Sequence, residues 1–213
     1  MLHIKTFVFN PYQENTYLIY DDHKNCIIVD PGMHNYQEEN HLKEYIESNG
    51  LKPIYLINTH GHIDHVLGNK FVADTYNLIP QFHEGELPLV IQVQNYAPQM
   101  GIRYEPSPIP ETFLKEEDII EIGDEKLSLI LAPGHSPAHL CLYSKKHNFL
   151  IGGDVLFKNS IGRTDLPGGN HQQLLDSIAT KIYTLPEETV VYPGHGPSTT
   201  VGEEKKTNPF IRA

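Results

Sequence analysis

Short hydrophobic runs, each bounded by turn-forming residues, recur along this chain of 213 residues and predict two groups of β-strands. The first group is predicted at residues 4–9, 15–20, 26–30 and 54–57, and the second at 119–122, 127–132, 140–143, 149–151 and 190–192. Helices are predicted at about 37–48, 65–76 and 172–183. Two strand-rich halves, each with helices, indicate an α+β protein in which two sheets pack together with helices outside.

The stretch from 87 to 110 follows neither the hydrophobic pattern of a helix nor that of a strand clearly. Residues 87–92 could open a helix, but prolines at 98, 106, 108 and 110 interrupt the pattern. We therefore expect a lid or peripheral loop in this stretch.

The composition fits one domain of the larger sort. Hydrophobic residues make up 39% of the chain and charged residues 20%, and the formal net charge is −11. Because this acidic balance repels phosphate groups, we expect neither nucleic acid nor a membrane as a partner. No run is long enough to cross a bilayer, and the first nine residues have the pattern of a strand, so we expect a cytoplasmic protein. Nothing in the pattern indicates an oligomeric state.

Three histidines and an aspartate lie in the tract 59–65, directly after the predicted strand at 54–57. Loops at strand ends can direct neighbouring side chains at one point, and imidazole and carboxylate groups are the usual ligands of zinc and related divalent metals. Alternation along the loop lets His60 and His62 face one ion while Asp64 and His65 face another. An exposed, tag-like histidine run is the alternative, which the preceding strand and the following helical pattern disfavour.

Three more candidate ligands occupy the same kind of position later in the chain. His135, Asp154 and His195 each follow a hydrophobic run and a glycine, which permits close approach of the backbone. Each of them alone would be an ordinary turn residue. Together with the tract 59–65 they indicate a centre for two metal ions.

The order of these motifs resembles the metallo-β-lactamase superfamily: His-x-His-x-Asp-His at 60–65, Pro-Gly-His at 133–135, Gly-Gly-Asp at 152–154 and Tyr-Pro-Gly-His at 192–195. The resemblance covers essentially the whole chain. The tracts 162–169, 193–197 and 202–209 are most similar to the short glyoxalase II-like hydrolases. The resemblance implies a four-layer αββα sandwich of two mixed sheets with helices outside. It also implies a single domain spanning 1–213, without a separate C-terminal helical substrate domain.

The resemblance implies a ligand set, residue by residue. The first metal would be bound by His60, His62 and His135, and the second by Asp64, His65 and His195, with Asp154 bridging the two. We expect two divalent ions, most simply zinc, with iron or manganese as alternatives.

A hydroxide shared by two such ions would attack a carbonyl or phosphoryl centre. The resemblance to glyoxalase II-like hydrolases implies that the substrate is a thioester, such as S-D-lactoylglutathione or a related hydroxyacyl thiol conjugate. The two carboxylates, Asp64 and Asp154, are the predicted catalytic residues, and a small molecule is the expected partner. Cys26 and Cys141 lie in strand-like runs, which indicates buried structural thiols rather than nucleophiles.

Arg163 is the candidate substrate-binding residue, because a guanidinium group pairs well with a substrate carboxylate. A salt bridge to Asp165 or a bond to a turn carbonyl is its alternative role. We expect His139 to pack beside the metal loops or to support a ligand without binding an ion. Asp30 has the pattern of a turn residue, and the resemblance implies that it supports the metal loops without binding a metal.

Two other functional classes stay open. The tract 162–165 is also similar to persulfide dioxygenases, which are oxidoreductases that use one iron at the first site. The other class is a metal-binding domain without catalysis, which seven intact ligand positions disfavour.

Overall fold

Two mixed β-sheets form the framework of the protein in a computed structural model, which describes residues 1–212. The chain divides into two units. The first comprises Met1–Phe82, Leu87–Leu114 and Glu121–Glu125, and the second comprises His83–Glu86, Lys115–Ile120 and the residues from Lys126 onward. The predicted ligands at 60–65 therefore belong to the first unit, and the later three belong to the second.

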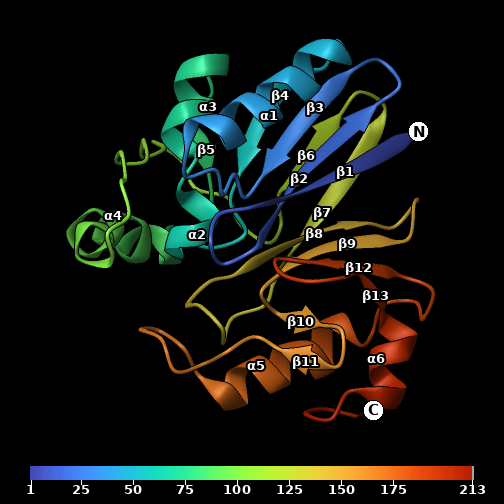
Figure 1. The fold of residues 1–213 in the computed structure, drawn as a ribbon. Helices are drawn as coiled ribbons and strands as arrows, with labels where there is room; N and C mark the ends of the chain where they lie inside the picture. The colour runs from blue at the N-terminus through green and yellow to red at the C-terminus, as the bar shows by residue number, and fades with distance from the viewer. Residues whose placement is uncertain (213) are drawn as a thin grey trace. The chain divides into compact units, whose positions relative to one another are not determined.

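The first sheet has the strand order β1-β2-β3-β4-β5 (Figure 1). Its strands are β1 Leu2–Phe9, β2 Glu14–Asp21, β3 Asn25–Val29, β4 Lys52–Ile57 and β5 Pro80–Gln81. The pairs β1–β2 and β2–β3 are antiparallel, whereas β3–β4 and β4–β5 are parallel and need helical crossovers between them. The first four predicted strands are confirmed, with ends shifted by one or two residues.

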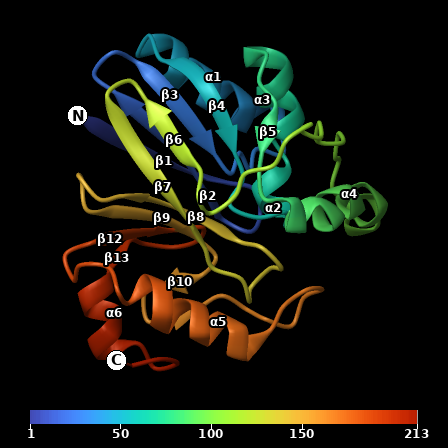
Figure 2. The same cartoon turned by 180° about the vertical axis from the view of Figure 1, so that it is seen from behind.

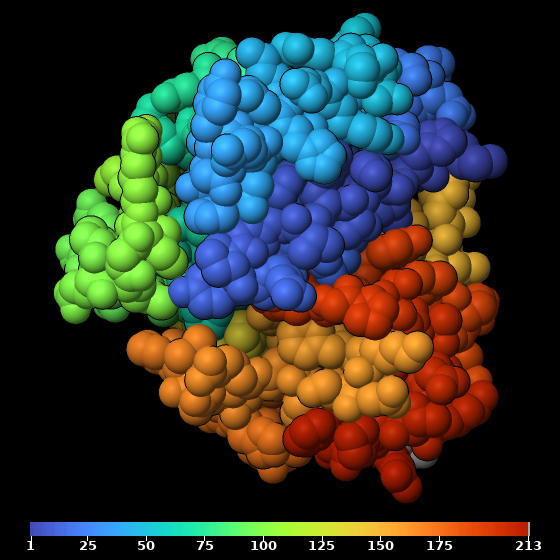
Figure 3. Space-filling view, viewed as in Figure 1, coloured from blue at the N-terminus to red at the C-terminus, as the bar shows by residue number. Residues whose placement is uncertain are grey.

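Strand β1 is an edge strand and lies at the surface in the space-filling view (Figure 3, dark blue). The ammonium group of Lys5 on this strand lies over the rings of Phe7 and Tyr45, 5.3 and 5.4 Å from their centroids. A charged side chain on an edge strand disfavours pairing with a strand of another chain.

Helices α1 Tyr36–Ser48 and α3 Asn69–Tyr76 pack on one face of the first sheet (Figure 1). The buried side chains of this interface include Leu18, Ile28, Leu42, Ile46, Leu56 and Val72. Helix α1 begins after Asn35, whose side chain accepts a hydrogen bond from the amide of Glu38 and so satisfies one of the first-turn donors. The predicted helix at 37–48 is confirmed.

The predicted helix at 65–76 is wrong as a single element. The chain forms a short helix α2, Ile63–Val66, and then α3, with Gly68 between them. The amide of Gly68 donates a hydrogen bond of 2.7 Å to the carbonyl oxygen of Pro31. A Cβ atom at this position would lie 2.8 Å from that oxygen and 2.7 Å from the Cε of Met33, so only glycine allows the approach that divides the helix.

The predicted lid or loop at 87–110 is wrong for its first part, because residues 87–100 are helical. Helix α4 Leu87–Tyr96 is followed by a 3-10 turn, Ala97–Met100. Val90, Val93 and Ala97 are spaced at helical intervals and are buried against a small core of the first unit. Proline in the first turn of a helix loses no hydrogen bond, so Pro88 and Pro98 do not prevent these helices.

The second sheet has the order β13-β12-β9-β8-β7-β6. Its strands are β6 Ile119–Ile122, β7 Glu125–Leu131, β8 Leu140–Ser144, β9 Phe149–Gly153, β12 Val190–Pro193 and β13 Thr199–Thr200. β9 and β12 run parallel, and the pairs β7–β8, β8–β9 and β12–β13 are antiparallel. All five strands predicted in this half are confirmed. Four short strands were not predicted. They are β5, β13 and the two strands of a short hairpin, β10 Leu156–Phe157 and β11 Ser160–Ile161.

Helices α5 His171–Ser177 and α6 Val201–Thr207 lie on one face of the second sheet (Figure 2). The core between them and the strands includes Cys141, Leu150, Leu174, Ile178, Val191 and Val201. Helix α5 continues into one π-helical stretch, Ile178–Ile182, which agrees with the predicted helix at 172–183. Helix α6 was missed, although Thr200 followed by Glu203 is a capping signal, and the Thr200 side chain accepts from the Glu203 amide. Within residues 1–212, no helix has the length and apolar character needed to cross a membrane.

Candidate metal centre

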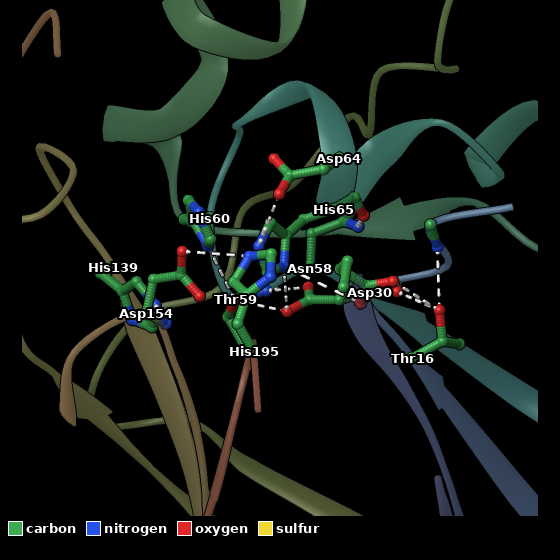
Figure 4. Close-up of polar contacts among 12 residues, drawn as sticks. Thr16, Asp30, Asn58, Thr59, His60, Asp64, His65, His139, Asp154 and His195 are labelled. Atoms are coloured by element: carbon green, nitrogen blue, oxygen red, sulfur yellow. Dashed lines mark hydrogen bonds and ion pairs between the residues drawn. The ribbon is translucent and has the colours of Figure 1, made fainter. Parts of the chain in front are cut away.

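The tract 59–65 leaves the end of β4 and is held by the carboxylate of Asp30, at the end of β3. The amide and the hydroxyl of Thr59 donate hydrogen bonds of 2.7 and 2.6 Å to the two oxygens of Asp30 (Figure 4). The Nδ1 atom of His65 lies 3.1 Å from the same carboxylate. Asp30 and Thr59 are both buried, so these bonds are shielded from water. The loop is thus fixed by one side chain from the neighbouring strand.

These contacts determine which ring nitrogen of each histidine carries the proton. The Thr59 hydroxyl has one proton and donates it to Asp30, so the Nδ1 of His60, 3.0 Å from that oxygen, must be the donor. His65 likewise donates from Nδ1 to Asp30. In both rings, Nε2 is then the nitrogen with the lone pair, which is the form that binds a metal ion.

The donor groups of the first unit lie close together. The ring centroids of His60 and His62 are 4.8 Å apart, and those of His60 and His65 are 4.1 Å apart. The Oδ2 of Asp64 is 3.7 Å from the Nε2 of His65, and Asp64 lies in the first turn of α2, where a carboxylate is favoured. The structure therefore brings all four predicted ligands of this unit into one cluster.

Asp30, His60 and His65 also form a geometric group of three donors within 4.8 Å of one another. The carboxylate of Asp30 already accepts bonds from Thr59 and His65, so its oxygens hold the loop. We therefore assign Asp30 a supporting role, as the resemblance implied, and not a metal-binding one.

Glu14 is a buried carboxyl group beside this tract that the sequence did not point to. Its Oε2 accepts a hydrogen bond of 2.9 Å from Thr16, and its Oε1 is 4.0 Å from the Nδ1 of His65. Burial raises the pKa of Glu14 well above its usual range, and the nearby His65 opposes this shift. Because Glu14 lies within an ordinary strand pattern, no sequence signal could have identified it.

The three predicted ligands of the second unit also meet. The Oδ2 of Asp154 lies 3.5 Å from the Nε2 of His135 and 3.5 Å from the Nε2 of His195. Figure 4 shows Asp154 and His195. Ligand atoms bound tetrahedrally to one zinc ion lie about 3.3 Å from each other. One carboxylate oxygen equally distant from two imidazole nitrogens fits the role of a bridge between two ions.

His135 carries its ring proton on Nδ1, as His60 and His65 do. Its Nδ1 donates a hydrogen bond of 2.8 Å to the carbonyl oxygen of Arg163, which leaves the Nε2 lone pair facing Asp154. The preceding Gly134 has φ +132, and a Cβ atom there would lie 2.2 Å from the backbone nitrogen of Leu174. Glycine is therefore required for the turn to pack against α5.

Glu86 is a second buried carboxylate that the sequence did not point to. Its Oε1 accepts hydrogen bonds of 2.7 Å from the hydroxyl of Ser136 and 2.6 Å from the amide of Ala138. These two residues directly follow the predicted ligand His135, so Glu86 fixes the turn that carries it.

The guanidinium of Arg163 pairs with Asp165, and its binding of a substrate carboxylate stays a prediction. Its guanidinium forms two hydrogen bonds of 2.7 Å with the carboxylate of Asp165, and both side chains are exposed. This pair raises the pKa of Arg163 and lowers the pKa of Asp165 to about 2. The backbone carbonyl of Arg163 holds His135, so the residue contributes to the site through its main chain.

Each unit thus carries part of the predicted ligand set, four residues in the first and three in the second. The donors fit divalent metal ions, because imidazole and carboxylate groups suit zinc, iron and manganese. Assembly of the two sets around shared ions stays a prediction.

Comparison with known proteins decides the family. Residues 9–195 match the model of the metallo-beta-lactamase superfamily. The chain belongs to this superfamily. Its fold is the metallo-β-lactamase fold, with two mixed sheets and helices, so the predicted family and fold class are confirmed. Members of this fold bind divalent metals, which agrees with the histidine and aspartate clusters described above.

Two curated relatives match over nearly their full lengths. A probable metallo-hydrolase of Bacillus subtilis, YqgX, is 38% identical over 202 residues, which cover 94% of this chain and 93% of the relative. The hydroxyacylglutathione hydrolase GloC of Haemophilus influenzae is 32% identical over 214 residues, which cover 100% of this chain and 99% of the relative. The superfamily membership and these relatives support a metal-dependent hydrolase.

Two solved structures of superfamily members are similar throughout. The B3 metallo-beta-lactamase BLEG-1 has a TM-score of 0.89 at 36% identity, with 99% of this chain and 100% of that chain covered. TTHA1623, in a di-iron-bound form, has a TM-score of 0.86 at 34% identity, with 97% and 100% covered. This chain therefore shares its fold with a B3 metallo-beta-lactamase and with a protein whose solved form binds two iron ions.

Proposed function

We propose that this protein is a metal-dependent hydrolase with two divalent ions in one active site. The first ion would be held by His60, His62 and His135, and the second by Asp64, His65 and His195, with Asp154 between them. The observation that carries this proposal is the equal 3.5 Å distance from one oxygen of Asp154 to His135 and to His195, which are the predicted ligands of different ions. The Nε2 lone pairs of His60, His65 and His135, set by their Nδ1 hydrogen bonds, support it.

Two bound ions would supply an acidified water molecule as nucleophile and would polarise the carbonyl group of the substrate. The protein itself offers no competing nucleophile at its cysteines. Cys26 and Cys141 are fully buried, and burial raises the pKa of the Cys26 thiol. Asp154 would hold the separation of the ions, and Asp64 would keep one acidic ligand at the exposed side of the cluster, where its side chain is only partly buried. These two are the proposed catalytic carboxylates.

The proposed substrate is a thioester, namely S-D-lactoylglutathione or a related hydroxyacyl thiol conjugate. The similarity to GloC over the whole of both chains supports this class. Zinc is the proposed metal, and the di-iron relative makes iron the main competitor. Because the protein has a formal net charge of −11, we propose a small molecule as its partner in place of nucleic acid or membrane. The cytoplasm is the proposed location.

Metal analysis combined with a thioester panel tests this function. We expect about two equivalents of metal per chain after purification without added metal, and hydrolysis of S-D-lactoylglutathione that a chelator abolishes. Replacing the exposed His171, which lies outside the ligand set, by Ala is the matched control and should change neither result. Absence of thioester hydrolysis by fully loaded protein would exclude the substrate class.

A mononuclear-iron persulfide dioxygenase is the second candidate. It is favoured by the Gly-Arg-Thr-Asp tract at 162–165, whereas the di-iron form of TTHA1623 supports iron as the metal but not a single ion. It requires one iron per chain and oxygen uptake with glutathione persulfide. Oxygen uptake by protein that holds a single iron and hydrolyses no thioester would favour this function over the hydrolase.

A further inference from the structure

His139 is a fully buried histidine that contacts the predicted bridging ligand without belonging to the ligand set. It follows the turn that carries His135 and immediately precedes β8. Its Nε2 lies 3.1 Å from the backbone amide of Asp154, and its side chain stands beside Asp154 in the close-up view (Figure 4). The carbonyl oxygen of His139 accepts a hydrogen bond of 2.8 Å from Ala132, which holds the backbone beneath the ring.

The protonation of this ring follows from its partner. A backbone amide can only donate, so the Nε2 of His139 must carry the lone pair, and the proton of the neutral ring is on Nδ1. That Nδ1 is 3.9 Å from the Sγ of Cys141, and the thiol is 3.5 Å from the carbonyl oxygen of Gly152. The hydrogen bonds therefore run in one direction, from Asp154 through His139 and Cys141 to Gly152.

His139 differs in this respect from the predicted ligands. In His60, His65 and His135 the proton is on Nδ1 and the lone pair is on Nε2, whereas in His139 the Nε2 lone pair accepts a hydrogen bond from the Asp154 amide. Both ring nitrogens of His139 thus have partners within the second unit, so the ring has no atom left with which to bind an ion.

We propose that His139 is a positioning residue that fixes the backbone of residue 154 and thereby directs the Asp154 carboxylate between His135 and His195. This inference rests on the proposed metal centre. The amide of Asp154 comes directly after the last residue of β9, so its hydrogen bond sets where the strand ends and where the side chain leaves it. Groups that orient a metal ligand in this way change metal affinity about 10- to 100-fold when they are removed.

Two substitutions separate the hydrogen bond from simple packing. His139→Gln keeps an acceptor near the position of Nε2, and His139→Leu fills similar space without one. We expect His139→Leu to weaken metal binding about 10- to 100-fold in a chelator competition, and His139→Gln to restore most of that loss. His147→Leu, in the turn between β8 and β9 of the same unit, is the matched control and should leave metal affinity unchanged. Equal loss in both His139 variants would overturn the proposal, since packing alone would then explain the effect.

A second measurement keeps the proposal testable if the variants do not fold. Long-range ¹⁵N NMR of the imidazole rings in the metal-free wild-type protein distinguishes the two neutral forms. We expect His139 to carry its proton on Nδ1, with Nε2 unprotonated. A proton on Nε2 would overturn the inference whatever the enzyme hydrolyses. Failure of the proposed function would instead appear as wild-type protein that binds no metal or cleaves no thioester, with the His139 ring unchanged.

Discussion

The hydroxyl of Ser136 donates a 2.7 Å hydrogen bond to the carboxylate of Glu86, a residue 50 positions earlier in the chain. The same oxygen of Glu86 also accepts a hydrogen bond from the amide of Ala138. The turn that presents His135 is therefore held by a side chain from the segment His83–Glu86, which belongs to the second unit although its sequence neighbours belong to the first.

Replacing Glu86 by Ala should lower the free energy of unfolding, because it leaves the Ser136 hydroxyl and the Ala138 amide buried without this acceptor. Each such group costs about 1–3 kcal/mol. Urea denaturation followed by circular dichroism measures the change. Glu86→Gln keeps an acceptor oxygen and should lose clearly less; a Gln variant as unstable as the Ala variant would contradict this explanation.

Replacing Asp154 by Ala should remove metal from both proposed sites and abolish turnover, because one carboxylate oxygen faces His135 and His195 at equal distance. Elemental analysis of the purified variant measures the metal content. Asp124→Ala, at an exposed position, is the control and should keep the wild-type content. Retention of one full equivalent of metal by the Asp154 variant would show that this residue serves a single ion and does not bridge.

Replacing Asp30 by Asn should weaken metal binding about 10- to 100-fold, because the carboxylate holds the backbone of Thr59 and the Nδ1 of His65. Competition with a chromophoric chelator gives the affinity. Asp21→Asn is the matched control: Asp21 is also buried and also accepts a hydrogen bond from a backbone amide, that of Asn25, but it is the last residue of β2 and lies outside the ligand tract. Equal loss of affinity in the two variants would indicate general destabilisation.

Replacing Arg163 by Ala should raise the KM for S-D-lactoylglutathione about tenfold if the guanidinium binds a substrate carboxylate, since such a contact is present in ground and transition states alike. A small neutral thioester should be hydrolysed almost equally by both forms. The Tm should not change, because the bond to Asp165 lies at the exposed surface. If the variant hydrolyses both thioesters equally poorly, Arg163 acts only by holding the loop of His135.

The carboxyl group of Asp165 should titrate near pH 2 in the wild-type protein, because the Arg163 guanidinium lowers its pKa to about 2. A folded-state pKa below the unfolded value means that the pair is fully formed above about pH 4 and is lost as the pH falls towards 2. Carboxyl NMR of Arg163→Ala should show the Asp165 midpoint returning to about 3.9. An unchanged midpoint would show that the ion pair does not form in solution.

Local pattern was sufficient for much of the fold and for the choice of candidate ligands. Hydrophobic runs of strand length predicted nine strands, because the burial of alternate or continuous apolar residues is recorded in the sequence itself. The ligands His60, His135 and Asp154 could be chosen because their residue types follow strand ends, where loops present side chains. The helix at 87–96 could also have been found, since proline is tolerated in a first helical turn.

Contacts between distant residues decided the rest. Pro31 and Met33 determine that the helix breaks at Gly68, and this close approach has no local signature. Whether Arg163 reaches Asp165 or another partner could not be chosen from sequence, because both roles use the same guanidinium chemistry. The protonated nitrogen of His139 was likewise undetermined until the Asp154 amide was located beside it. A sequence records which groups can donate or accept, but only the folded backbone determines which of them meet.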